Sequence, residues 1–256
     1  DMCPADSDPA SGSGSSAAQG ERVATLRSCL ARWRSELRGW PPLLPRRLVP
    51  EVAEELQSRG LRVLGFNLLA DGKQGEEKWE CTPPDALDWK YRRWLLLEEL
   101  TVHEPDILLL QEVDAEHFDG FFVPELARVG YAGVFKRMPD SRPDGVAVFW
   151  STDSLALVGY EGIELRASAE VALAATLSSS RPGLERLVVA STHLKSGKNE
   201  ASEQLREAQV QELLDRLQAL ADGSPVVLAG DFNAEPVASE KIGPALALPA
   251  ALQHPL

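Results

Sequence analysis

The sequence contains little cysteine and no long apolar segment. The three cysteines, Cys3, Cys29 and Cys81, are odd in number, and their spacing fits neither a disulfide framework nor a zinc site. The longest apolar runs, such as 107–110 and 225–230, are strand-length and far below the ~18 residues of a membrane span. The N-terminus has no basic and apolar stretch of the secretory kind. We therefore expect a cytoplasmic protein in a reducing compartment, with no membrane span.

Basic residues are also scarce. Lysine and arginine number 26 against 39 acidic residues, which gives a formal net charge of −13. A protein that coats nucleic acid by charge alone needs a broad basic surface, so the composition argues against that class. An enzyme with a local basic pocket remains compatible, and a carboxylate-rich metal site would itself add negative charge.

The first 20 residues contain no aliphatic side chain larger than alanine apart from Met2. This composition predicts a disordered tail. From Glu21, apolar side chains recur at steps of three and four, which predicts an amphipathic helix. The residues of that stripe are Val23, Leu26, Leu30, Trp33 and Leu37.

The basic face of this helix has two interpretations. It is either the solvated side of a helix packed on the domain, or a remnant of a targeting helix, which leaves a mitochondrial location as the alternative. The proline-rich segment 40–47 breaks the helix and predicts a linker. The predicted organisation is a tail over 1–20, a helix and linker over 21–60, and a globular domain over 61–256.

Short strands at uneven spacing dominate the remainder. The predicted strands cover 61–67, 105–113, 131–135, 145–150, 155–160, 171–177, 186–194 and 225–233. The predicted helices cover 83–99, 118–129 and 200–221. With so few crossover helices, the pattern fits neither a doubly wound sheet nor a barrel of βα units. The expected fold class is α/β of the α+β kind, with two packed, mostly antiparallel β-sheets flanked by helices.

Polar side chains close four of the predicted strands. They are Asn67, Glu112, His193 and the pair Asp231 and Asn233. A polar group at the end of an apolar strand is costly to bury without a partner, so a metal ion or a substrate is the natural explanation. Oxygen donors such as Glu112 suit Mg²⁺ or Mn²⁺, and no cluster of histidine and cysteine competes for that role.

The same residues have ordinary structural roles when taken singly, as turn formers or as a satisfied histidine. Their joint occurrence, each at a strand end, favours chemistry. Asp231 could orient or deprotonate a water molecule, and Asn67, His193 and Asn233 could donate hydrogen bonds to phosphoryl oxygens.

Four motifs give a resemblance to a known family. FN at 66–67, LQEVD at 110–114, THLK at 192–195 and GDFNAEP at 230–236 resemble the endonuclease/exonuclease/phosphatase superfamily. The resemblance is strongest to its nocturnin-like branch, which is related to the carbon-catabolite-repressor-type deadenylases. The supporting matches are KWEC at 78–81, RVGYAGVF at 128–135, RPDGVAVF at 142–149 and REAQ at 206–209. The similarity runs from about Leu61 to Pro236.

This resemblance implies a four-layer sandwich and a role for each site residue. Glu112 would be the main ligand of Mg²⁺, with Mn²⁺ as a possible substitute. Asn67 would lie near the metal-bound phosphate, and Asp231 would handle the nucleophilic water. The groups implied to hold the substrate are His193 and Asn233 on the scissile phosphate, with Lys195 and Lys136 as phosphate-binding lysines.

Two enzymatic functions follow from the resemblance. The first is hydrolysis of the 2′-phosphate of NADP(H), and the alternative is removal of nucleotides from the 3′ end of poly(A) RNA. A hypothesis of another class is a non-catalytic binding module that retains the fold. No obligate protein partner is indicated.

The chain departs from the family pattern at its end. The superfamily closes its site with a late Ser-Asp-His motif, and nothing after Pro236 matches it. The resemblance therefore implies that the domain is incomplete at its C-terminus and lacks the last strands of the second sheet. On this expectation, catalysis by residues 1–256 alone is weak or absent.

Overall fold

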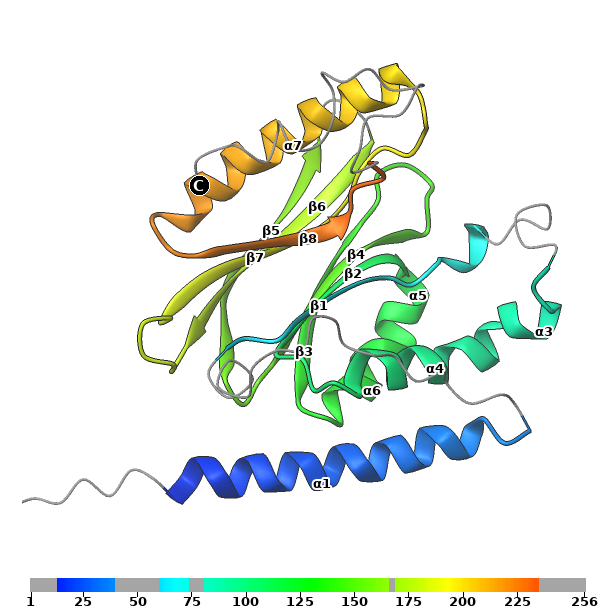
Figure 1. Ribbon diagram of the computed structural model, residues 1–256, viewed down its shortest axis with the longest axis vertical. Helices are drawn as coiled ribbons and strands as arrows, with labels where there is room; N and C mark the ends of the chain where they lie inside the picture. Colours follow the sequence, from blue (N-terminus) through cyan, green and yellow to red (C-terminus); the bar gives the residue numbers. More distant parts are fainter. Residues whose placement is uncertain (1–12, 40–59, 74–80, 166–168, 235–256) are drawn as a thin grey trace, which may run out of the picture.

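The computed structural model describes residues 13–39, 60–73, 81–165 and 169–234. Two four-stranded sheets pack face to face, and helices cover their outer faces (Figure 1). Among the described helices, none is long and apolar enough to cross a membrane.

The first sheet has the strand order β1-β2-β4-β3. Its strands are β1 (Val63–Asn67), β2 (Ile107–Asp114), β3 (Tyr131–Arg137) and β4 (Asp144–Ser151). β1 and β2 run parallel, whereas β4 pairs antiparallel with both β2 and β3. The ends of β1 and β2 and the start of β4 therefore lie at the same rim.

The second sheet has the order β5-β6-β7-β8. Its strands are β5 (Leu155–Leu165), β6 (Glu170–Ser179), β7 (Arg186–His193) and β8 (Val226–Asp231). β7 and β8 run parallel, and the other pairs are antiparallel. Each sheet thus carries one parallel pair among antiparallel neighbours, which confirms the predicted fold class.

Three apolar layers hold the sandwich together. β2 has four consecutive aliphatic residues that are all fully buried. Leu108 and Leu110 face the helices that cover the first sheet, whereas Ile107 and Leu109 face the second sheet. A third cluster packs the second sheet against the long helix α7 (Glu200–Ala221). The run of aliphatics is explained by burial on both faces of a central strand.

The remaining helices lie beside the first sheet. They are α1 (Ser13–Glu36), η1 (Asp71–Lys73), α3 (Pro84–Leu87), α4 (Trp89–Thr101), α5 (Ala115–His117), the π-helical turn η3 (Phe118–Phe122) and α6 (Val123–Ala127). All but η1, which lies at the rim beside Glu112 and Asp144, are on the outer side of the sheet. The predicted helix 83–99 is divided at Asp88, whose side chain caps α4 by accepting from the Lys90 backbone N–H at 2.7 Å. The predicted helix 118–129 is likewise divided.

α1 extends further toward the N-terminus than predicted. The sequence predicts disorder through residue 20, but the helix begins at Ser13. Its predicted apolar stripe packs on the core through Leu26, Trp33 and Leu37. A docked helix propagates cheaply into neighbouring residues, which explains the additional turns. Residues 1–12 and the predicted linker 40–47 lie outside the described residues.

Candidate active site

The parallel pairs of the two sheets end at one rim of the sandwich. Asn67 ends β1 in the first sheet and Asp231 ends β8 in the second. The Asn67 side-chain amide donates to Glu112 Oε1 at 3.1 Å and to Asp231 Oδ2 at 2.9 Å. One carboxamide therefore joins carboxylates from both sheets, as expected from their place at strand ends.

A β-bulge presents Glu112 to this rim. The pairing of β2 with β4 skips from Gln111 to Val113, and Glu112 has a φ of 53°. A left-handed backbone is uncommon for a residue other than glycine, and such strain is concentrated at functional sites. The second carboxylate oxygen of Glu112 accepts from the Ala70 backbone N–H at 3.2 Å. The side chain is only 11% exposed.

His193 lies between the two carboxylates. It pairs with Asp231 in the parallel ladder, and its Nε2 is 3.9 Å from Glu112 Oε1 and 3.8 Å from Asp231 Oδ2. Burial lowers the pKa of His193, and the nearby positive charge of Lys73 lowers it further, against the opposing carboxylates. His193 is therefore neutral at pH 7. Its buried Nδ1 has no hydrogen-bond partner within the described part of the chain.

Asn233 lies directly beyond β8 and is held by two hydrogen bonds. Its backbone N–H donates to Asp231 Oδ1 at 3.0 Å, and its side-chain amide donates to the Leu194 carbonyl at 2.9 Å. The φ of Asn233 is 51°, which asparagine tolerates better than most residues. These bonds fix Asp231 and the turn after β8 relative to the end of β7.

The two predicted phosphate-binding lysines lie in different surroundings. Lys195 follows β7 two residues after His193, and its backbone is fixed by Gln209 Oε1 at 3.1 Å and by Arg206 Nη1 at 2.8 Å. Lys136 lies in β3, and its ammonium pairs with Glu164 of β5 at 2.7 Å. This ion pair therefore joins the Lys136 ammonium to β5 of the second sheet.

Sequence reasoning missed two charged residues at the same rim. Lys73 Nζ is 2.7 Å from Asp144 Oδ2 and 3.5 Å from Glu112 Oε1. Asp144 begins β4, and its side chain is only 2% exposed. Because β4 is antiparallel to β2, the start of β4 lies where β2 ends. The Pro-Asp-Gly at 143–145, immediately before an apolar run, was the available signal.

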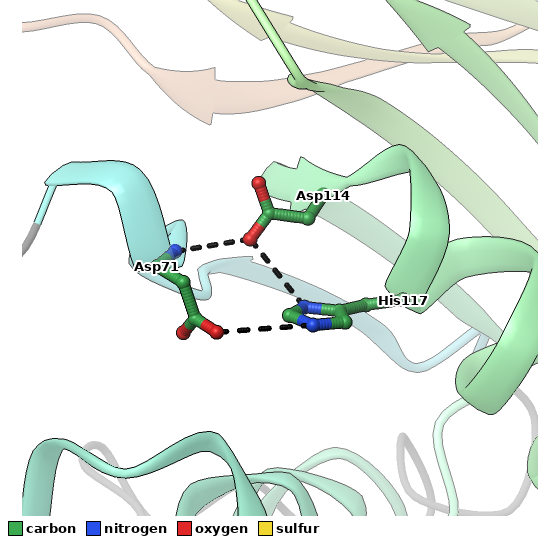
Figure 2. A group of neighbouring side chains, drawn as sticks. All are labelled: Asp71, Asp114 and His117. Carbon is green, nitrogen blue, oxygen red and sulfur yellow. Dashed lines mark hydrogen bonds and ion pairs between the residues drawn. The ribbon is translucent and has the colours of Figure 1, made fainter.

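A second group of titratable side chains adjoins this rim. Asp71, Asp114 and His117 bring ligand atoms within 4.8 Å of one another, so they could hold a metal ion (Figure 2). Asp114 Oδ2 accepts from the Asp71 backbone N–H at 3.0 Å and is 3.4 Å from His117 Nδ1. All three line a pocket of about 370 Å³ that also includes Arg137.

This second group already carries a compensating charge. Arg92 donates to Asp71 Oδ1 at 2.9 Å and to the carbonyls of Leu68 and Leu69. Burial raises the pKa of Asp71, although His117 and Arg92 oppose that shift. The Trp89 ring stacks on His117 at 3.7 Å between centroids. The group therefore ties the loop after β1 to α4 and to the end of β2.

The side chains of Asn67, Glu112 and Asp231 fit a divalent cation by the chemistry of their donor atoms. Carboxylate oxygens of Glu112 and Asp231 face one another across the Asn67 amide. Two carboxylates that accept from the same amide nitrogen are close enough to repel each other, and a cation bound between them would offset this electrostatic repulsion. Hard oxygen donors select hard cations. His193 Nε2, which is 3.9 Å from Glu112 Oε1 and 3.8 Å from Asp231 Oδ2, adds a nitrogen that can form a hydrogen bond at the same place.

Comparison with known proteins agrees with this geometry. The model of the endonuclease/exonuclease/phosphatase family matches residues 64–249. Nocturnin of Xenopus laevis is 37% identical over 196 residues, covering 70% of this chain and 49% of that protein. The chain thus spans about half the length of the relatives it matches.

Two solved structures share the fold. The catalytic domain of human nocturnin, with bound sulfate, superposes with a TM-score of 0.59 at 36% identity, covering 69% of this chain and 65% of that one. ANGEL2, a 2′,3′-cyclic phosphatase in complex with adenosine-2′,3′-vanadate, gives a TM-score of 0.62 at 26% identity, covering 69% and 54%. On the extent of the family match and these similarities, the chain belongs to the endonuclease/exonuclease/phosphatase family.

Proposed function

We propose that this chain carries the active site of a Mg²⁺-dependent nucleotide phosphoesterase that hydrolyses the 2′-phosphate of NADP(H). The observation that carries the proposal is the Asn67 amide, which holds Glu112 and Asp231 together where the two sheets meet. A structural role alone gives little reason to bring two carboxylates to one amide, because their charges repel.

In this proposal Glu112 holds the ion. Its carboxylate is oriented by Asn67 and by the Ala70 backbone N–H, so little reorganisation accompanies binding. When bound, the ion polarises a phosphoryl oxygen and neutralises the charge that develops there. Mn²⁺ has similar ligand preferences and is expected to substitute.

The other residues position the phosphate and the water. Asp231 is about one third exposed, so water reaches its carboxylate, which orients the nucleophile and accepts its proton. Neutral His193 donates from Nε2 to a phosphoryl oxygen, and Asn233 and Lys195 contact the phosphate from the β7–β8 side. Hydrogen-bond donors that are already positioned toward the charge that develops in the transition state make a large contribution to enzymatic rate enhancement.

Two observations favour a small dinucleotide over a long polyanion as the substrate. The formal net charge of −13 opposes a long polyanion, whereas a dinucleotide needs only a local contact. The solved structure of ANGEL2 holds a vanadate on the 2′ and 3′ positions of an adenosine. NADP(H) likewise carries a phosphate on the 2′ position of its adenosine, and this is the group that the proposed reaction removes.

The test measures phosphate release from NADPH beside shortening of a poly(A) RNA, both in Mg²⁺. The assays use this chain and the longest natural product of the gene that contains it. We expect the longest natural product to release phosphate, and chelation of the metal to abolish that release. Glu112→Gln should lower the rate at least ~10²-fold, as loss of a group essential to charge stabilisation does, while leaving the circular dichroism spectrum unchanged.

Two other outcomes would overturn the proposal. Shortening of poly(A) without release of phosphate from NADPH would support the exoribonuclease that the family resemblance implies. Binding of Mn²⁺ and NADPH by the longest natural product without turnover of either substrate would support the non-catalytic binding module.

A further inference from the structure

We propose that Lys73 couples the binding of the divalent cation to the binding of the phosphate. The inference rests on the proposed function, because it takes Glu112 as the ligand of the ion. Its structural basis is the place of the Lys73 ammonium, 3.5 Å from Glu112 Oε1 and 2.7 Å from Asp144 Oδ2.

The loop that carries Lys73 is fixed from two sides. Arg92 of α4 binds the carbonyls of Leu68 and Leu69 and the carboxylate of Asp71. Asp114, at the end of β2, accepts from the Asp71 backbone N–H (Figure 2). η1 therefore starts at an anchored residue, and Lys73 ends it two residues later. The ammonium is held beside the carboxylates of the site.

The ammonium and a metal ion are like charges that share one carboxylate. With the site otherwise empty, Lys73 partly neutralises Glu112 and repels an incoming cation. A bound phosphate changes the balance, because its negative charge attracts both the ammonium and the ion. Phosphate should therefore strengthen metal binding, and by linkage the metal should strengthen phosphate binding by the same factor.

A purely structural role for Lys73 makes a different prediction. Asp144 is buried, and a buried carboxylate without a partner is destabilising, so Lys73 could serve only to neutralise it. In that case Lys73→Met lowers the free energy of unfolding and leaves the effect of phosphate on metal affinity unchanged. The coupling, rather than stability, is the measurement that separates the two roles.

The experiment measures Mn²⁺ affinity by electron paramagnetic resonance of the unbound ion, with and without inorganic phosphate. In the unaltered chain we expect phosphate to tighten Mn²⁺ binding about tenfold, a typical coupling between sites. In Lys73→Met, Mn²⁺ should bind more tightly without phosphate, and phosphate should change the affinity less than about twofold. Lys73→Arg retains the charge and should retain the coupling.

The matched control is Lys90→Met. Lys90 is an exposed lysine of α4, so the variant changes the net charge equally and should behave like the unaltered chain. If Lys73→Met fails to fold, the double variant Lys73→Met with Asp144→Asn removes both partners of the ion pair. In that variant, only the effect of phosphate on Mn²⁺ affinity is measured.

The outcomes separate this inference from the proposed function. Equal effects of phosphate in the unaltered chain and in Lys73→Met would overturn the role of Lys73 and leave the Glu112 site intact. Absence of Mn²⁺ binding by the unaltered chain, or unchanged binding by Glu112→Gln, would overturn the metal site and the coupling together.

Discussion

Burial sets the protonation state of His193, which lies between two carboxylates. Removal from water lowers its pKa, the charge of Lys73 acts in the same direction, and Asp231, Glu112 and Asp144 oppose both. The neutral ring is therefore stable in the folded chain, whereas in the unfolded chain the imidazole titrates near its ordinary pKa of about 6.5.

This difference makes stability depend on pH. Above about pH 6.5, His193 is neutral in both states and costs nothing. As the pH falls below that value, His193 becomes protonated in the unfolded chain but stays neutral in the folded chain. The free energy of unfolding therefore decreases until the pH falls below the pKa of His193 in the folded chain. Urea unfolding of metal-free protein should show a smaller loss of stability between about pH 7.5 and about pH 5 in His193→Gln than in the unaltered chain.

The control for this prediction is His103→Gln, which changes a histidine on the loop after α4. That variant should lose stability on acidification like the unaltered chain. Equal pH dependence of His193→Gln and the unaltered chain would contradict the burial argument.

The residues of the site differ in how well the sequence predicted them. Asn67, Glu112, His193 and Asp231 end or nearly end parallel strands, so a polar residue after an apolar run located all four. Asp144 was not predicted because it starts an antiparallel strand, where the polar residue comes before the apolar run and not after it.

The contacts of Lys73 and Lys136 could not be predicted from the sequence. Lys73 comes from a three-residue turn whose path depends on Arg92, 19 positions later in the sequence. The family resemblance implies that Lys136 binds the substrate phosphate, and this stays a prediction, whereas its ion pair with Glu164 joins separate strands and was not predicted. Long flexible side chains take partners from the tertiary structure, which local sequence does not encode.

At the scale of the element, the approach of β7 and β8 depends on Gly230. A Cβ added at this position would lie 2.1 Å from the Thr192 carbonyl oxygen of the neighbouring strand. Backbone atoms cannot swing aside, so Gly230→Ala should force the strands apart and displace Asp231. We expect the free energy of unfolding to fall by about 2 kcal/mol, a typical cost of overpacking, in urea titration.

Gly159 in β5 provides a matched comparison. A Cβ at Gly159 meets nothing within 4 Å. Gly159→Ala should therefore change the free energy of unfolding by less than about 0.5 kcal/mol. Similar losses in both alanine variants would mean that the close approach at Gly230 is not the cause.

The docking of α1 depends on Trp33. Its side chain is fully buried, and its Nε1 donates to Glu125 Oε2 at 2.9 Å, while Arg34 binds Glu98 at 2.8 Å. Trp33→Ala should weaken docking by about 3 kcal/mol. Hydrogen exchange of the α1 amides should then accelerate by about a hundredfold, with β2 still protected.

Arg38, an exposed residue just beyond α1, is the control for that experiment. Arg38→Ala should leave the exchange of α1 unchanged. If Trp33→Ala accelerates exchange in β2 as much as in α1, then α1 is part of the global unfolding unit instead of a separately docked helix.

The sequence predicted the bounds of a helix well where its apolar residues follow a single helical periodicity. α7 matches its predicted range of 200–221, with Asn199 as its N-cap and Asp222 and Gly223 in left-handed conformations at its end. The segment 118–129 was predicted as one helix, because its apolar spacing is helical throughout. The π-helical turn over Phe118–Phe122 arises from packing its three phenylalanines into the core, and helical spacing does not reveal it.

At the scale of the whole molecule, the two sheets share one pattern of strand directions. A parallel edge pair is followed by two antiparallel strands, in the order β1-β2-β4-β3 and in the order β8-β7-β6-β5. The sequence predicted two packed sheets from strand number and spacing. It did not predict which strands are neighbours, because register and order depend on contacts between distant segments.

The Asn67–Asp231 hydrogen bond spans 164 positions of the chain, and this has a consequence for folding kinetics. Such a contact closes only after intervening segments have collapsed, and chains of this size populate partly folded intermediates. In stopped-flow refolding, the far-UV signal of the helices should recover first and the capacity to bind Mn²⁺ last. Recovery of both signals with one time constant would mean that the two halves of the sandwich condense in a single step.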